Sequence, residues 1–420
     1  MNETINSENL ITYDDFLSTS RRCHYNQFIA EFYERFADDN RVPMQLRGDG
    51  EVVYGKDPNF IRRAKRVKEC CSTWTFDFYP KSKYKHLIRV DRCKDRFCLN
   101  CQALKADQRF VQYAPLLDEY LETNDMYHVV FTVPNVDADR LRDTVEMMFD
   151  RFSYMLRYFR GSKKVKGVDF EKYGYRGAVR ALEITVSKRD GTFHPHLHCI
   201  FVLKKNLDLP QVYWNKFSND RTGRTPMRLM TELDILLQRV WCLLITKKEV
   251  NAENIANIGS VTGYSDGFSC RADLSNGKYH EIFKYAIKGS FKDETLFVYE
   301  NFLTLLGALY RIHCYKNYGC LSKDKEGKKI NFNEVDEDLG LYGTDKAFEL
   351  FLKKLQWCEV PRRVDELLSE IIKESAAGEM KFISRATFTR HFKALSEEDK
   401  RMYLEKLQDG LDGYDNGENE

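Results

Sequence analysis

Long apolar runs are missing from this 420-residue sequence, and so is a basic leader followed by an apolar segment. A membrane-spanning helix needs about 20 mostly apolar residues, so we expect no membrane span and no membrane partner. The polar, acidic start from Asn2 to Glu8 is unlike a signal peptide, and we expect the protein to act in the cytoplasm. Its 12 cysteines are then better interpreted as thiols or metal ligands than as disulfides.

An excess of one charge is also missing, because 66 lysines and arginines nearly balance 64 aspartates and glutamates. The net charge therefore predicts no partner. The distribution is uneven, however, with 17 basic against 8 acidic residues from Arg41 to Arg109, and 9 acidic against 3 basic from Glu397 to Glu420. A basic body with an acidic tail favours contact with nucleic acid, although charge fluctuation alone can produce such patches.

A fixed-period repeat and a low-complexity array are absent too. Strand patterns occupy Met126–Val133, Ala178–Val186 and His194–Leu203, and helical patterns occupy Tyr25–Phe36, Asp137–Phe159 and Leu229–Ile245. From these patterns we predict five parts: a polar segment with a helix (1–40), a basic cysteine-rich region (41–112), a strand-rich domain (113–325), a helical region (326–408) and an acidic disordered tail (409–420).

Histidines alternate along the strand-like segment His194–Leu203. Side chains of a strand point to opposite faces in turn, so His196 and His198 share one face. The other face is apolar and is predicted to pack on the core (Leu197, Cys199, Phe201 and Leu203). Two imidazoles about 6.5–7 Å apart along a strand can bind one divalent metal ion. The alternative interpretation is a surface histidine cluster beside a half-buried strand.

A hairpin is predicted between this strand and Ala178–Val186, because Asp190-Gly191 between them is a strong turn signal. A two-residue loop at Asp190-Gly191 places Glu183 directly across from His198. Directly opposed side chains have Cβ atoms about 4.5–5.5 Å apart. Glu183 is therefore predicted to complete a His-His-carboxylate metal site.

Glu281, Tyr285 and Lys288 recur at helical spacing and are expected to project from one face of a helix. A tyrosine hydroxyl has a pKa of about 10 in water, so a nucleophilic tyrosine needs a nearby cation or base. Lys288 can stabilise the phenolate, and Glu281 can take a proton from a second attacking hydroxyl or water. Taken alone, the same pattern is typical of an ordinary amphipathic helix with a salt-bridged face.

Five cysteines are grouped as Cys70-Cys71 and, further on, Cys93, Cys98 and Cys101. Four thiolates from two short segments satisfy tetrahedral Zn²⁺, and the Cys98-x2-Cys101 spacing is typical of such sites. Either Cys70 or Cys71 can supply the fourth ligand, and the sequence does not choose between them. Buried thiols without a metal are the alternative.

These segments, in this order, resemble the motifs of the single-tyrosine replication initiators of rolling-circle plasmids, within the HUH endonuclease superfamily. Phe131-Thr132-Val133 resembles the first motif of that family, His194-Pro195-His196-Leu197-His198 the second, and Glu281-x2-Lys284-Tyr285-x2-Lys288 the third. Residues 180–185 are similar to the strand that supplies the metal-binding carboxylate, and 92–101 to the cysteine-rich segment. The resemblance extends over residues from about 65 to 325.

The resemblance implies a nickase that cuts one strand of an origin and stays attached through a 5′-phosphotyrosine. Tyr285 is then the nucleophile, and Glu281 matches the carboxylate that activates water at termination. His196 and His198, with Glu183 as third ligand, would bind Mn²⁺ or Mg²⁺. The free 3′-OH primes synthesis by the host polymerase, and a host helicase is expected as a further partner. The DNA partners are single-stranded and duplex origin DNA.

Patterns and resemblance together predict an α+β fold, in which a central antiparallel sheet of about five strands carries flanking helices. A small cysteine-rich zinc element precedes this HUH-type domain and a helical region follows it. Ser384–His391 has a weak helix-turn-helix-like pattern for duplex DNA, which a packing helix explains equally well. The competing functions are a transposase or relaxase of the same superfamily, or a zinc-dependent DNA-binding regulator.

Overall fold

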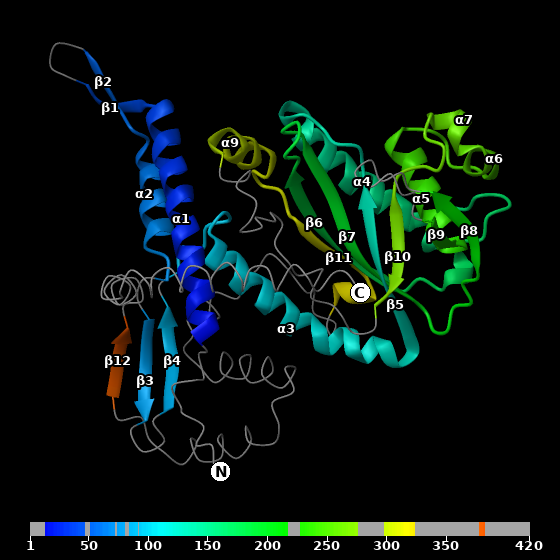
Figure 1. Ribbon diagram of the computed structural model, residues 1–420, viewed down its shortest axis with the longest axis horizontal. Coiled ribbons are helices and arrows are strands. Elements are labelled where there is room, and N and C mark those ends of the chain that lie inside the picture. Colours follow the sequence, from blue (N-terminus) through cyan, green and yellow to red (C-terminus); the bar gives the residue numbers. More distant parts are fainter. Residues whose placement is uncertain are drawn as a thin grey trace. The chain divides into compact units, whose positions relative to one another are not determined.

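The computed structural model describes residues 13–46, 51–71, 74–79, 84–90, 92–216, 227–275, 298–323 and 378–382. The chain divides into two units, one comprising residues 1–111 and 334–420 and the other residues 112–333 (Figure 1). Helix α3, Leu99–Thr123, begins in the first unit and ends in the second. Among the described residues, no helix combines the length and apolar character that a bilayer crossing requires.

A pair of packed helices with a β-hairpin between them begins the first unit. Aromatic side chains hold the helices together, and the rings of Phe36 and Phe60 meet edge to face with centroids 4.6 Å apart. The second helix begins after Asp57, whose side chain accepts a hydrogen bond from the backbone N–H of Asn59. The elements are α1 (Tyr13–Asp39), β1 (Val42–Leu46), β2 (Val52–Gly55) and α2 (Pro58–Lys68).

A three-stranded antiparallel sheet follows in the same unit, in the order β12-β3-β4. Its strands are β3 (Trp74–Tyr79), β4 (Tyr84–Val90) and β12 (Gly378–Phe382). The prediction that 326–408 is helical is therefore wrong at Gly378–Phe382, which pairs with β3 about 300 residues earlier in the chain. Pairing over such a distance leaves little local signal. The rest of that region, including Ser384–His391, lies outside the described residues.

The second unit is built on a five-stranded antiparallel sheet in the order β10-β5-β7-β6-β11. This confirms the predicted α+β fold with a central sheet of five strands. Its strands are β5 (Asn124–Thr132), β6 (Gly177–Val186), β7 (Phe193–Lys204), β10 (Cys270–Leu274) and β11 (Tyr315–Gly319). A separate hairpin consists of β8 (Gln211–Lys216) and β9 (Met227–Thr231).

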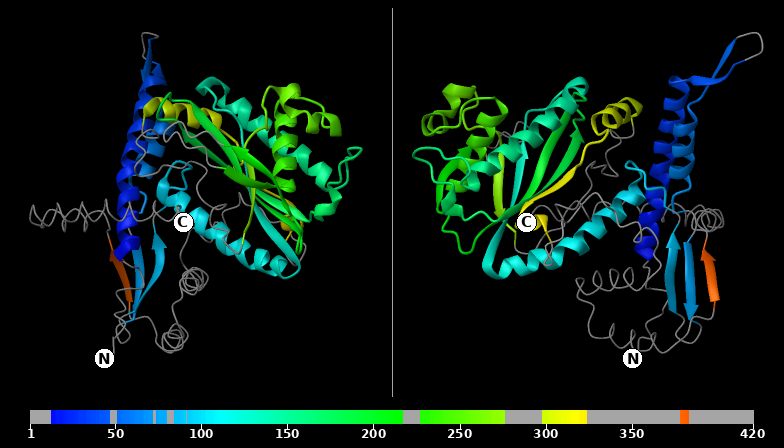
Figure 2. Two further views of the ribbon diagram at one scale, coloured as in Figure 1. Left: turned by 45° about the vertical axis from the view of Figure 1, so that its right-hand side comes forward. Right: turned by 180° about the vertical axis from the view of Figure 1, so that it is seen from behind.

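Helices cover one face of this sheet (Figures 1 and 2). They are α4 (Leu141–Phe159) and α5 (Glu232–Ile245), with α6 (Ala252–Ala256), α7 (Ile258–Thr262) and α9 (Tyr299–Ala308) around them. Short 3-10 turns occupy Ala138–Arg140, Glu171–Tyr173 and Cys320–Ser322. The predicted helix Leu229–Ile245 begins later than expected, because Thr231 and Asp234 form a capping box there and 227–231 is strand β9.

The core lies between the sheet and these helices. Phe131 of β5 contacts Phe152 of α4 and Trp241 of α5, with ring centroids 5.6 and 5.1 Å apart. The predicted core face of β7 is confirmed, since its four apolar side chains are fully buried (Leu197, Cys199, Phe201 and Leu203). The histidines of β7 therefore lie on the opposite face of the sheet, away from α4 and α5.

Candidate functional site

The hairpin between β6 and β7 positions the histidine face. Its last backbone bond before the loop runs from Ser187 N–H to Thr192 O, so residues 188–191 form a longer loop than the predicted two residues. Gly191 adopts φ of 70°, a left-handed conformation that favours glycine. The Asp190 carboxylate accepts hydrogen bonds from the backbone N–H and the hydroxyl of Thr192 and holds the loop.

The longer loop shifts the register of the hairpin by two residues. Glu183 lies opposite His196, and the predicted pairing with His198 is wrong. Because side chains alternate with period two, a shift of two residues leaves Glu183 on the same face as both histidines. The structure therefore brings Glu183, His196 and His198 together as predicted, although the predicted register is wrong.

The side chains of Glu183, His196 and His198 meet on this face. Glu183 Oε2 lies 3.2 Å from His196 Nε2 and 2.6 Å from His198 Nε2. One donor atom from each residue lies within 4.8 Å of the other two. The side chains are only 7%, 12% and 14% exposed, so the trio is held largely out of water.

The chemistry of this trio fits a divalent metal ion. Burial by itself raises the pKa of Glu183, but hydrogen bonding and charge interaction with the two histidines hold that pKa well below its usual range. His198 Nε2 is buried, and the carboxylate oxygen Oε2 of Glu183 lies 2.6 Å from it. A buried imidazole nitrogen beside a carboxylate and a second imidazole is a donor set for metals such as Mn²⁺.

A histidine that the sequence analysis missed, His128 of β5, completes the surroundings of this trio. Its Nε2 lies 3.1 Å from Nδ1 of His198, and the two rings stack with centroids 5.3 Å apart. His128 shares one face of β5 with Val130 and Thr132, as the strand pattern predicts. Only the pairing of β5 with β7 reveals that this is the face of the sheet that carries His196 and His198. Burial, and then the neighbouring His196, lower the pKa of His194 at the start of β7.

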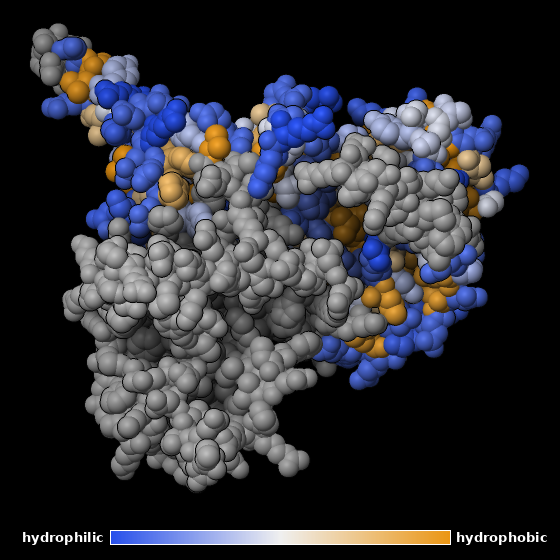
Figure 3. Space-filling model, in the orientation of Figure 1, coloured by the Kyte–Doolittle hydropathy of each residue, from blue (hydrophilic) through white to orange (hydrophobic). Residues whose placement is uncertain are grey.

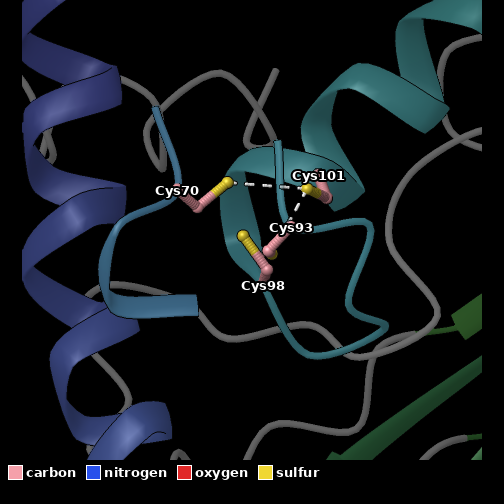
Figure 4. Close-up of side chains that lie close together, drawn as sticks. All are labelled: Cys70, Cys93, Cys98 and Cys101. Carbon is pink, nitrogen blue, oxygen red and sulfur yellow. Dashed lines mark hydrogen bonds between the residues drawn. The ribbon is translucent and has the colours of Figure 1, made fainter. Parts of the chain in front are cut away.

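A second group consists of four buried thiols in the first unit, from Cys70, Cys93, Cys98 and Cys101. The Sγ atoms of Cys70 and Cys93 each lie 3.6 Å from Sγ of Cys101. Figure 4 shows the side chains pointing toward one another. Zn–S bonds of about 2.3 Å in a tetrahedron place sulfur atoms about 3.8 Å apart, so the thiols are already near the spacing of a zinc site. No disulfide joins the cysteines of the described residues.

Of the two adjacent cysteines between which the sequence did not choose, Cys70 is the one that lies in the four-thiol group. Cys71 is buried as well, and its Sγ lies 3.8 Å from that of Cys70, but it is not part of the four-thiol group. Cys71 has a φ of 61°, a left-handed conformation that separates the directions of the two side chains. The thiol of Cys101 lowers the pKa of Cys70, whereas burial raises the pKa of Cys98.

Side chains of helices α1 and α2 form hydrogen bonds with the cysteine loop, residues 92–98, which precedes α3. These contacts were not predicted from the sequence. Asn26 of α1 donates to Cys98 Sγ over 3.2 Å and accepts the N–H of Leu99, the first residue of α3. Asp95, inside the loop, accepts hydrogen bonds from Arg63 of α2 and from the hydroxyl of Tyr33 of α1. The thiols therefore lie on a polar framework shared by three helices.

The residues of the predicted tyrosine motif, Glu281, Tyr285 and Lys288, lie outside the described residues. The described part of the chain stops at Ser275, just after β10, and resumes at Val298, just before α9.

Comparison with known proteins finds a family model and several relatives that match part of the chain. Residues 84–213 match a family model described as "Replication protein". Over 197 residues the chain is 30% identical to Protein rep of Bacillus amyloliquefaciens, a match covering 46% of this chain and 49% of that protein. It is 29% identical over 154 residues to Protein rep of a Bacillus species, covering 36% and 46%. It is 26% identical over 151 residues to Protein rep of Staphylococcus aureus, covering 35% and 61%.

The chain thus spans about half the length of the curated relatives that it matches. No solved structure matches it.

Proposed function

Residues 84–213 match the replication protein family model, and from this premise we propose that the chain is an initiator that nicks one strand of a plasmid-type double-strand origin. The observation that carries the proposal is the meeting of Glu183, His196 and His198 on one face of an antiparallel sheet. Two imidazoles and a carboxylate suit Mn²⁺ or Mg²⁺, and such an ion would polarise a scissile phosphate as a Lewis acid.

The chain's own groups would carry the covalent step. Tyr285 is the proposed nucleophile: its phenolate oxygen forms a bond to phosphorus while the bond to the 3′ oxygen breaks. The products are a 5′-phosphotyrosine on the protein and a free 3′-OH, which primes synthesis by the host polymerase. Lys288 would stabilise the phenolate, and Glu281 would take the proton of the group that later releases the strand.

His128 is the proposed positioning residue of this site. A metal ligand at His198 Nε2 requires the ring proton on Nδ1, and Nδ1 lies 3.1 Å from His128 Nε2. A hydrogen bond donated by this Nδ1–H to Nε2 of His128 would fix both the tautomer and the orientation of the His198 ring.

Replacing His128 by alanine is expected to weaken Mn²⁺ binding about 10–100-fold, the usual effect of losing such a partner. Titration calorimetry of the metal against the purified protein measures it. His313→Ala, at an exposed histidine of the same unit, is the control and should bind Mn²⁺ like the unaltered protein. Equal affinity in the His128 and His313 variants would remove His128 from the site.

The four-thiol group is the proposed structural zinc site. Four cysteine ligands leave no open position for a substrate, which distinguishes such sites from catalytic ones. Cys70, Cys93, Cys98 and Cys101 would hold Zn²⁺ and join the cysteine loop to α2 and α3.

The test of the proposed function is covalent capture of DNA. Incubation of the protein with Mn²⁺ and a single-stranded oligonucleotide containing the plasmid origin should give an adduct that migrates with the protein on a denaturing gel. Tyr285→Phe removes the nucleophilic oxygen and should abolish the adduct. Tyr310→Phe, at an exposed tyrosine of the same unit, should leave it unchanged. An adduct that persists in Tyr285→Phe would contradict the assignment of the nucleophile.

A further inference from the structure

Helix α2 of the first unit presents a row of cations to solvent. Arg62, Lys65 and Arg66 are exposed and follow one another at the i, i+3, i+4 spacing of a single helix face. The opposite face, with Ala64 and Val67 fully buried, is the one that packs inside the unit. The helix contains no acidic residue, although Asp57 caps its start and Glu69 follows its end.

These cations are largely without carboxylate partners. Within the part of the chain that the structure describes, Arg63 is the one residue of α2 with an ion pair, to Asp95, and it lies to the side of the exposed row. Arg62 donates to the amide oxygen of Asn59, and Arg66 to the backbone oxygen of Cys93. Both guanidinium groups are thus oriented while keeping their full charge.

The two carboxylates at the end of α1 form ion pairs outside this row. Asp38 is held by Arg41 and Lys56, which flank the hairpin, and Asp39 by Arg35 of the same helix. These two carboxylates therefore leave the cationic face of α2 without neutralising it.

The β1–β2 hairpin, which leads directly into α2, exposes apolar side chains. Tyr54 is 57% exposed, Met44 56% and Val52 40%. Few other large apolar side chains are this exposed among the described residues. Figure 3 shows orange residues on this hairpin, at the upper left, beside hydrophilic neighbours. A two-stranded ribbon with apolar side chains at its surface can enter a DNA groove.

We propose that α2 and the β1–β2 hairpin form a binding surface for duplex DNA, separate from the metal site of the second unit. The cations of α2 would contact phosphates, and Tyr54 of the hairpin would contact sugars or base edges in an adjacent groove. The inference rests on the proposed function in one respect, because the duplex in question is the DNA that flanks the nicked strand. A cationic row beside exposed apolar side chains complements a polyanion with apolar groove walls better than it complements an acidic protein surface.

Duplex binding by the full-length protein, measured by fluorescence anisotropy with an origin-containing duplex over a range of salt concentrations, tests the surface. Arg62→Gln with Lys65→Gln should weaken binding about 10-fold at about 0.15 M salt. The slope of log K against log salt should become less steep by about 1.8, because each lost phosphate contact contributes about 0.9. Tyr54→Ser should weaken binding without changing that slope.

The control removes the same charge elsewhere. Lys166→Gln with Lys248→Gln, at exposed positions of the second unit, should leave both affinity and slope unchanged. Equal losses in the two double variants, or no change in either, would overturn the proposed surface. If a protein partner occupies this surface instead, duplex affinity will be unaltered in Arg62→Gln with Lys65→Gln, which also overturns it.

Adduct formation on a single-stranded oligonucleotide separates this inference from the proposed function. The α2 and hairpin variants should form the adduct at the normal rate, since they do not alter the metal site or Tyr285. A protein that never forms the adduct, yet loses duplex affinity only in the α2 variant, would retain the surface and lose the nicking function.

Discussion

Replacing Glu183 by glutamine is expected to abolish Mn²⁺ binding at the sheet and to slow adduct formation about a thousandfold. Glutamine keeps the size of the side chain, but its neutral amide cannot balance a divalent cation beside two neutral imidazoles. A Lewis acid that stabilises the transition state by about 4 kcal/mol corresponds to about three powers of ten in rate. Titration calorimetry and single-turnover adduct formation measure the two effects.

The control for this experiment is Glu249→Gln, the same chemical change at an exposed position of the same unit. It should bind Mn²⁺ and form the adduct like the unaltered protein. Circular dichroism in the presence of a chelator should show an intact fold for Glu183→Gln, because the surrounding strands are held by the sheet core. Normal Mn²⁺ affinity in the Glu183 variant would exclude the trio as the metal site.

The identity of this trio could be predicted from the sequence because it depends only on alternation. His196 and His198 share a face in any strand, and Glu183 shares it in any register that differs by an even number of residues. The register itself could not be predicted, since Asp190-Gly191 is compatible with loops of different length. The bonds from Thr192 to the Asp190 carboxylate accompany a four-residue loop over 188–191.

Residues that support the two sites escaped prediction for a different reason. His128 reaches His198 only because β5 pairs with β7, and Asn26 reaches Cys98 from a helix more than 70 residues earlier. Strand order and helix packing are long-range properties, and a single sequence carries no periodic signal for them. The same limit explains why β12, which pairs with β3, was assigned to a helical region.

Replacing Cys98 by serine is expected to remove zinc from the protein and to destabilise the first unit. Serine is a poor ligand for Zn²⁺, and Cys98 is fully buried among the other three thiols. Structural zinc contributes about 10–16 kcal/mol of binding free energy in small zinc-dependent folds. Losing only about 3 kcal/mol of this would lower the Tm of a unit of this size by about 6–12 °C. Atomic absorption and calorimetric melting measure zinc content and stability.

The adjacent cysteines supply a matched pair for this experiment. Cys70→Ser should lose zinc as Cys98→Ser does, because Cys70 belongs to the four-thiol group. Cys71→Ser makes the same change one residue away and should keep one zinc per chain, with only the smaller cost of a hydroxyl at a buried position. Zinc lost from Cys71→Ser and kept by Cys70→Ser would reverse the assignment of the fourth ligand. An unaltered protein purified without zinc, and unaffected by adding it, would instead favour four buried thiols without a metal.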